Sequence, residues 1–261
     1  MKLAELAPER VAVAVEHLLP EAAPVRPLRT LREGRSHRSW VLDSGLGRLV
    51  GKVAMTNRTE VVLHRLAEHR RVAGLGVPVP NLLGFTPSSE LVGGRMLIVA
   101  EYLDGQDAEE AFSSMPVDAM ASVLRSTGAA LRQLHQVSVP AFGDVYLPNI
   151  LVDAQGRFRA LLDLEHVRWV DPAMDFVKPA MWMFEGRPEW ADAFADGYGI
   201  AKAQPPCWPE RLSVATGLEL LTGVDYWTRV RDEAMREDYL RRLRAWVRSD
   251  GVRHVWSSVT T

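Results

Sequence analysis

Asp144, Asn149 and Asp163, in the middle of the chain, have side chains and a spacing that suit phosphate chemistry. Asp144 and Asn149 are five residues apart across a turn in FGDVYLPNILVD, and Asp163 follows Asn149 by fourteen residues. One carboxylate could take a proton, while an amide oxygen and a second carboxylate are the hard oxygen ligands that Mg²⁺ prefers. Proton removal beside a Mg²⁺ ion is the chemistry of phosphoryl transfer.

The residues around Asp163 support this interpretation, although a simpler one exists for Asn149. Asp163 is the single acid of the apolar, strand-like run ALLDL at residues 160–164. A carboxylate is costly to bury unless it has a partner or binds a metal. Asp, Asn and Pro all favour turns, so Asn149 by itself could belong to an ordinary surface turn.

The first hundred residues are predicted to form mostly strands, with one helix among them. SWVLDSG (39–45) and RLVGKVA (48–54) are short β-type runs joined by a glycine-containing turn, which indicates a hairpin. Apolar residues at helical spacing predict a helix over residues 59–75, which GVPVP ends. The apolar composition of RMLIVAEYL (95–103) predicts a buried strand.

The remainder is predicted to be mostly helical. A long helix is expected over residues 117–135, and helices over much of 172–256, with breaks at GRPE and AQPPCWPE. A strand-rich part followed by a helix-rich part suggests two lobes and a cleft. The first twenty residues contain three glutamates within an apolar stretch, which predicts a short amphipathic helix and not a signal peptide.

Composition excludes several classes of protein. The 261 residues are 47% hydrophobic and 25% charged, which is enough apolar material for a buried core. A net charge of -2 without a basic stripe argues against a nucleic-acid partner. No apolar run approaches the roughly 20 residues that span a bilayer, so no membrane partner is expected. The single Cys207 excludes an internal disulfide and a cysteine metal cluster, and we expect a cytoplasmic monomer or homodimer.

Five segments resemble one known family. GDVYLPNILVD followed by LLDLEHVRWVDPAMD is similar to the aminoglycoside phosphotransferase and choline kinase-like family, whose catalytic loop reads H-G-D-x-x-x-x-N and whose metal segment reads I-D-W-E, ending in D-P-x-x-D. Upstream, RLVGKVA resembles the strand with the phosphate-binding lysine, GVPVPNLLGF the linker after the first helix, and LIVAEYLDG the strand and hinge beside adenine. The resemblance runs from about Glu33 to Tyr198 in the family's order.

The resemblance implies a fold class and a domain organisation. We expect a bilobal protein kinase-like α+β fold, with an antiparallel sheet in the N-terminal lobe and a mostly helical C-terminal lobe. The nucleotide-binding lobe would span residues 1–100 and the hinge 101–106. Residues 107–261 would form the helical lobe with the catalytic loop and the acceptor site.

The same resemblance implies roles for individual residues. Asp144 would be the base or orienting group for the acceptor hydroxyl, and Asn149 and Asp163 would hold Mg²⁺ on the nucleotide phosphates. Lys52 would contact the α and β phosphates as a point charge. The partner of Lys52 would be Glu68, with Glu60 as the alternative.

Further residues would bind the nucleotide or brace the catalytic loop. Gly34 and Ser36 lie where the nucleotide-covering loop belongs, and Glu101 and Leu103 would offer backbone groups to adenine. Asp171 and Asp175 would brace the loop. Each role has a simpler alternative: Lys52 could be a snorkelling lysine on an edge strand, Glu68 a surface acid, and Asp171 a helix cap.

Two departures from the family pattern affect the substrate prediction. Phe142 stands where the family has histidine in the catalytic loop. The chain runs from His135 to Asp144 in about nine residues, where many antibiotic kinases of the family insert a helical segment that helps to bind the acceptor. The acceptor site must therefore be built mainly from the C-terminal helices.

We therefore expect a small-molecule kinase that transfers the γ-phosphoryl group of ATP, or GTP, to a hydroxyl of an antibiotic, amino sugar or related metabolite. Acids that could bind a cationic acceptor are Glu165, Glu185, Glu189 and Asp192. The alternative is a catalytically silent nucleotide-binding module, suggested by Phe142 and the glycine-poor loop at Gly34. A protein kinase is less well supported because no activation-segment signature follows Asp163.

Overall fold

A computed structural model describes most of the chain and divides it into two compact units, Met1–Asp104 and Gly105–Thr261. The side chains of residues 59–62 and 137 are not described, so the side chain of Glu60 is outside the described part, as are Gly34 and Ser36 entirely. The residues described are 6–31, 37–55, 59–137, 141–164, 167, 169–200 and 204–249.

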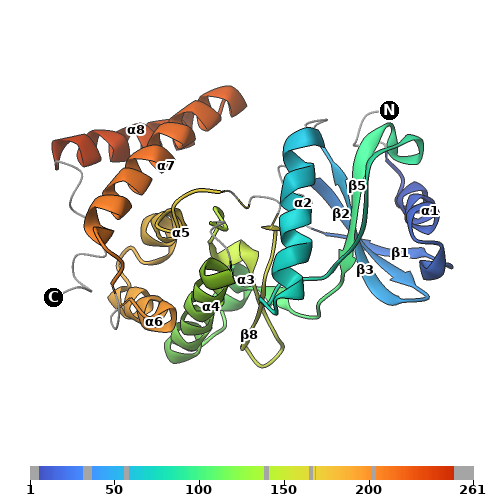
Figure 1. Cartoon of the computed structure of the whole chain (residues 1–261), viewed down its shortest axis with the longest axis horizontal. Coiled ribbons are helices and arrows are strands. Elements are labelled where there is room, and N and C mark those ends of the chain that lie inside the picture. Colours follow the sequence, from blue (N-terminus) through green and yellow to red (C-terminus); the bar gives the residue numbers. More distant parts are fainter. Residues whose placement is uncertain are drawn as a thin grey trace. The chain divides into compact units, whose positions relative to one another are not determined.

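The first unit is a five-stranded antiparallel sheet with a helix on each face (Figure 1). The strands lie in the order β1-β2-β3-β5-β4. The helices are α1 (Pro8–Leu18) and α2 (Thr59–Gly74), and the strands are β1 (Arg26–Thr30), β2 (His37–Ser44), β3 (Gly47–Ala54), β4 (Leu82–Ser89) and β5 (Arg95–Glu101). The hairpin, the helix and the buried strand expected in this part of the sequence are all present.

The alternation of β3 separates its apolar side chains from Lys52. Leu49 and Val53 point into the larger core, which packs against α1, whereas Ala54 belongs to the core on the α2 face. Side chains two residues apart share a face of a strand, so Lys52 lies on the α2 face with Ala54. Because β3 pairs with both β2 and β5, Lys52 is in an interior strand, and the edge-strand alternative is wrong.

The second unit is mostly helical and contains a small antiparallel sheet of three strands, β6-β7-β8. None of the helices in the described ranges combines the length and apolarity that a bilayer crossing needs. The strands are β6 (Gln106–Asp107), β7 (Ile150–Val152) and β8 (Phe158–Leu161); the helices are α3 (Ala108–Phe112), α4 (Val117–Val137), α5 (Met174–Lys178), the π-helical turn η6 (Pro179–Met183), α6 (Pro188–Tyr198), α7 (Trp208–Val230) and α8 (Glu233–Arg248).

Helices α4 and α6 touch along their backbones because each has a glycine at the contact. A Cβ atom at Gly197 would lie 1.8 Å from the carbonyl oxygen of Arg125, and one at Gly128 would lie 2.3 Å from that of Phe194. Any larger residue at either position would push the helices apart. The close approach brings His135, near the end of α4, to Tyr198, at the end of α6.

Candidate active site

A buried carboxylate fixes the backbone just before Asp144. Asp175 accepts hydrogen bonds from the backbone N–H groups of Phe142, at 2.6 Å, and Gly143, at 2.5 Å. Gly143 has a φ of 78°, a conformation that side-chain-bearing residues rarely adopt. The side chain of Asp175 is fully buried, so no water competes for these donors. The second aspartate of DPAMD therefore braces the loop in the way that the resemblance implied.

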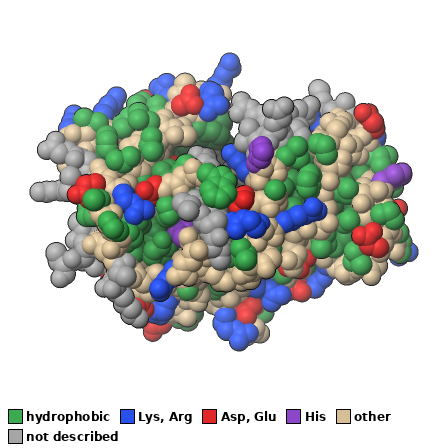
Figure 2. Space-filling view, in the orientation of Figure 1, with side chains coloured by type: hydrophobic (Ala, Val, Ile, Leu, Met, Phe, Trp, Pro, Cys, Tyr) green, Lys and Arg blue, Asp and Glu red, His purple; other side chains and the backbone are tan. Residues whose placement is uncertain are grey.

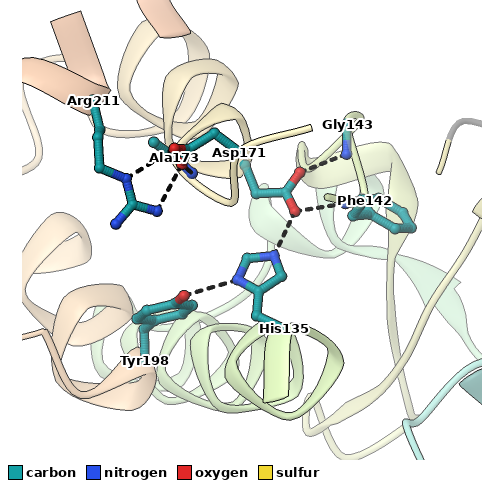
Figure 3. Close-up of polar contacts among 8 residues, drawn as sticks. His135, Phe142, Gly143, Asp171, Ala173, Tyr198 and Arg211 are labelled. Atoms are coloured by element: carbon teal, nitrogen blue, oxygen red, sulfur yellow. Dashed lines mark hydrogen bonds and ion pairs between the residues drawn. The ribbon is translucent and has the colours of Figure 1, made fainter. Parts of the chain in front are cut away.

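His135 and Tyr198 complete the network around Asp175 (Figure 3). The Nε2 atom of His135 lies 2.9 Å from Asp175 Oδ2, and its Nδ1 lies 2.8 Å from the Tyr198 hydroxyl. Burial, followed by the charge of Asp175, raises the pKa of Tyr198 to about 12, so the phenol keeps its proton. Tyr198 can then donate to Nδ1 while Nε2–H donates to the carboxylate. The loop before Asp144 is thus anchored to α4, α5 and α6 together.

Asp171, the first aspartate of DPAMD, holds α7 instead of the loop. Arg211 donates from Nε and Nη2 to the two carboxylate oxygens of Asp171, each at 2.8 Å, and the N–H of Ala173 donates to one of them (Figure 3). Burial raises the pKa of Asp171, but the hydrogen bonds from Arg211 and Ala173 outweigh it, and the pKa is lowered overall. The two aspartates therefore brace different elements.

The Asp171–Arg211 pair should make stability depend on pH in the acid range. Because the pKa of Asp171 is lowered in the folded state, its stabilisation is complete above its unfolded pKa of about 3.9 and is lost as pH falls through the folded value. Asp171→Asn should therefore cost stability at pH 6 and less at pH 3, as measured by urea unfolding. An equal cost at both pH values would exclude this linkage.

Asp144 is held by Asn149 and by Lys178. The Nδ2 atom of Asn149 lies 2.9 Å from both the backbone oxygen and the Oδ2 of Asp144, and Lys178 Nζ forms an ion pair with Asp144 Oδ1. Both oxygens facing Asn149 can only accept, so its amide nitrogen must face Asp144 and its Oδ1 is directed elsewhere. Asn149 is 4% exposed, which makes a simple surface-turn role for it untenable.

Lys178 was not among the site residues expected from the sequence, although its spacing from Asp175 in the helix could have indicated it. Residues three apart share a face of a helix, and Lys178 follows Asp175 by three residues in α5. Since Asp175 binds the N–H groups of Phe142 and Gly143, the next turn of the helix faces Asp144. The lysine is half-buried, with a side chain 24% exposed.

The β7–β8 hairpin brings Asp163 to the same end as Asn149. Ile150 pairs with Leu161, and the N–H of Leu162 donates to the carbonyl oxygen of Asn149 at 2.9 Å. The strand expected over 160–164 ends at Leu161, and Asp163 then adopts a left-handed φ of 64°. Aspartate tolerates this conformation better than most residues. Asp144, Asn149 and Asp163 are therefore grouped at one end of this hairpin.

These residues fit a magnesium ion by their donor chemistry. Asp163 offers a carboxylate and Asn149 an amide oxygen, and Mg²⁺ typically takes one or two protein ligands and completes its shell with water and phosphate oxygens. Across the described ranges, no three His, Cys, Asp or Glu side chains are grouped as metal ligands. A site made of one carboxylate, one amide and a nucleotide does not require such a group.

In the first unit, Glu68 does not have the partner expected for it. Its carboxylate accepts from Nε and Nη2 of Arg71, at 3.0 and 2.9 Å, one turn along α2. The side chain of Glu68 is 17% exposed and that of Arg71 is 36% exposed, so the acid is the better shielded partner. The family resemblance implied Lys52 as its partner, but a neighbouring arginine on the same helix binds the acid. The alternative, Glu60, has its side chain outside the described part.

The last residue of β5 and the residue that follows it are hydrogen-bonded to neighbouring segments of the first unit. The N–H of Glu101 donates to Asn81 O at 3.0 Å, and its carboxylate accepts from Asn81 Nδ2 at 2.9 Å. The N–H of Tyr102 donates to Arg48 O at 3.1 Å. Leu103 follows and is half-buried. Any ligand contact of Glu101 would therefore use a group other than its N–H.

Comparison with known proteins agrees with this architecture. The family model APH, described as the phosphotransferase enzyme family, matches residues 27–143 and 139–212, which is more than half of the chain. A solved structure that matches is the GDP and kanamycin complex of APH(2")-IIia, with a TM-score of 0.62 and 12% identity, over 89% of this chain and 96% of that one. No curated protein matches the sequence.

Because the identity is only 12%, the structural match shows the fold alone. An antiparallel sheet unit followed by a mostly helical unit is the kinase-like α+β fold that the sequence predicted. The family model adds the activity class to this fold. The chain belongs to the APH phosphotransferase family and is a phosphotransferase.

Proposed function

We propose that the protein transfers the γ-phosphoryl group of ATP or GTP to a hydroxyl group of a small molecule, such as an antibiotic, an amino sugar or a related metabolite. The observation that supports this most directly is the grouping of Asp144, Asn149 and Asp163 at one end of the β7–β8 hairpin. The likeness to a protein bound to GDP and kanamycin supports a purine nucleotide and a small acceptor.

Asp144 is the proposed base. The acceptor oxygen attacks the γ-phosphorus, its proton passes to the Asp144 carboxylate, and the nucleoside diphosphate leaves with the electrons of the broken P–O bond. Asn149 fixes the orientation of that carboxylate by donating to Oδ2. Lys178 faces Oδ1 and places a positive charge beside the site where the phosphoryl group transfers.

Further residues are proposed to bind the nucleotide. A Mg²⁺ ion held by Asn149 and Asp163 would neutralise charge on the phosphates. Lys52 would contact the α and β phosphates, Gly34 and Ser36 would lie in the covering loop, and the backbone of Glu101 and Leu103 would meet the base.

A thermal-shift experiment tests the metal assignment. Saturating ATP–Mg²⁺ or GTP–Mg²⁺ should raise the Tm of the wild type by roughly 5–10 °C at a hundredfold excess over Kd. Asp163→Ala should remove the Mg²⁺-dependent part of this shift, because it deletes the carboxylate ligand. Asp153→Ala is the control, since Asp153 lies in the exposed turn of the same hairpin and binds Arg157.

Two results would contradict the proposal in different ways. An undiminished Mg²⁺-dependent shift in Asp163→Ala would remove Asp163 from the metal site. A normal nucleotide shift in the wild type with no transfer to any acceptor in a broad panel would support the silent nucleotide-binding module.

The buried Phe142, whose N–H remains bound by Asp175, argues for a loop that is still anchored.

A further inference from the structure

Large apolar side chains are exposed together on α7 and on the segment before α5. Val214, Leu218 and Leu221 lie on one face of α7 and are 62%, 53% and 56% exposed. Trp169 and Val170, just before α5, are 63% and 38% exposed. Figure 2 shows hydrophobic side chains on the part of the surface that α7 and α8 form. Contiguous apolar exposure is a feature of surfaces that bind ligands or other molecules.

Part of this surface is a groove of about 390 Å³. That volume is within the range of small-molecule sites, roughly 300–1,000 Å³. Its walls are mainly apolar, and two of its charged residues, Asp171 and Arg211, are bound to each other. The lining residues are Val170, Asp171, Met174, Glu210, Arg211, Val214, Ala215, Leu218 and Thr222.

The groove is connected to Asp144 through α5. Met174 lines the groove and lies four residues, or about 6 Å along a helix, before Lys178 on the same face. Lys178 forms the ion pair with Asp144. Met174, which lines the groove, and Lys178, which binds Asp144, therefore lie on the same face of α5.

Of the acids expected to bind a cationic acceptor, the three that the structure describes do not line this groove. Glu185 lies 3.5 Å from Arg242, and Glu189 and Asp192 are exposed on α6, which packs against α4. Glu165 lies outside the described residues. Among the described residues that line the groove, Glu210 is the only acid besides Asp171, which Arg211 neutralises. Among these described residues, a polycationic ligand would therefore meet few acidic groups to compensate for the water that it loses on binding.

We propose that this groove binds the acceptor, and that the acceptor is a hydroxyl compound with a large apolar body rather than a polycationic amino sugar. The inference rests on the proposed kinase function. The apolar body packs against Val214, Leu218 and Met174, and its hydroxyl group is directed toward Asp144.

The test measures phosphoryl transfer to four hydroxyl compounds of increasing apolarity: kanamycin, choline, an alkyl glucoside and a macrocyclic lactone. The last two should be the better substrates. Leu218→Ser should raise the KM for them about tenfold or more, while kcat and the KM for the nucleotide stay within twofold. Val230→Ser is the matched control, because Val230 is exposed on α7 and does not line the groove.

The outcomes separate this inference from the proposed function. Transfer to kanamycin or choline alone, or equal KM values in Leu218→Ser and Val230→Ser, would overturn the apolar acceptor and leave the kinase activity standing. Transfer to none of the four compounds, with no Mg²⁺–nucleotide thermal shift, would overturn both. Calorimetric binding of the lactone to the wild type, weakened by Leu218→Ser, would support the groove independently of turnover.

Discussion

Asp144→Asn should lower the rate of phosphoryl transfer by roughly two to four orders of magnitude while nucleotide affinity is retained. Asparagine has the shape of aspartate but cannot take up the proton of the acceptor hydroxyl. The substitution also leaves the Lys178 ammonium without its anionic partner. Asn149 can still donate to the backbone oxygen of residue 144, so the loop should keep its conformation.

Single-turnover transfer and calorimetric nucleotide binding, measured on the same samples, distinguish a chemical defect from a binding defect. Asp153→Asn is the control, because it makes the same chemical change in the exposed turn of the β7–β8 hairpin. Wild-type turnover in Asp144→Asn would show that Asp144 is not the base. A parallel loss of nucleotide affinity would place its role in binding.

Asp175→Ala should lower the free energy of unfolding by about 3–5 kcal/mol. The fully buried carboxylate accepts from the N–H groups of Phe142 and Gly143 and from His135, and alanine would leave these donors buried without an acceptor. Asp175→Asn keeps one acceptor oxygen, so it should lose less stability and should fold if the alanine variant does not. Urea unfolding measures both.

The control for this prediction is an exposed ion pair in the same unit. Asp196 binds Arg125 at 2.9 Å with both side chains 52% exposed, and Asp196→Ala should cost less than about 1 kcal/mol. Equal costs for the Asp175 and Asp196 variants would contradict the structural role of the buried network. Because the network holds the loop before Asp144, Asp175→Asn should also lower kcat more than it raises the KM for the nucleotide.

Local patterns in the sequence were sufficient to predict the main helices and strands and part of the candidate site. Strand alternation and helical spacing depend on neighbours in the chain, so the β2–β3 hairpin, α2 and α4 are where they were expected. The grouping of Asn149 with Asp163 follows from a short hairpin, whose ends meet whatever surrounds it. A motif within about twenty residues is thus largely a local property.

Contacts between residues that are far apart in the chain could not be predicted from such local patterns. Glu68 was expected to pair with Lys52, but Arg71 one turn away binds it. Spacing in the sequence does not tell which of two nearby cations an acid will bind. No partner of His135 could be predicted from its position in the sequence. The structure places its side chain, which is 5% exposed, between Asp175 and Tyr198.

The sequence by itself determined the order of strands and helices and the spacing of Asp144, Asn149 and Asp163, because both depend on backbone geometry over short distances. The tertiary structure decided which partners these side chains meet. Lys178 reaches Asp144 because Asp175, on the same helix, binds the loop, and the α4–α6 contact at Gly128 and Gly197 brings His135 to Tyr198. Such contacts depend on how closely whole helices approach, which no single segment specifies.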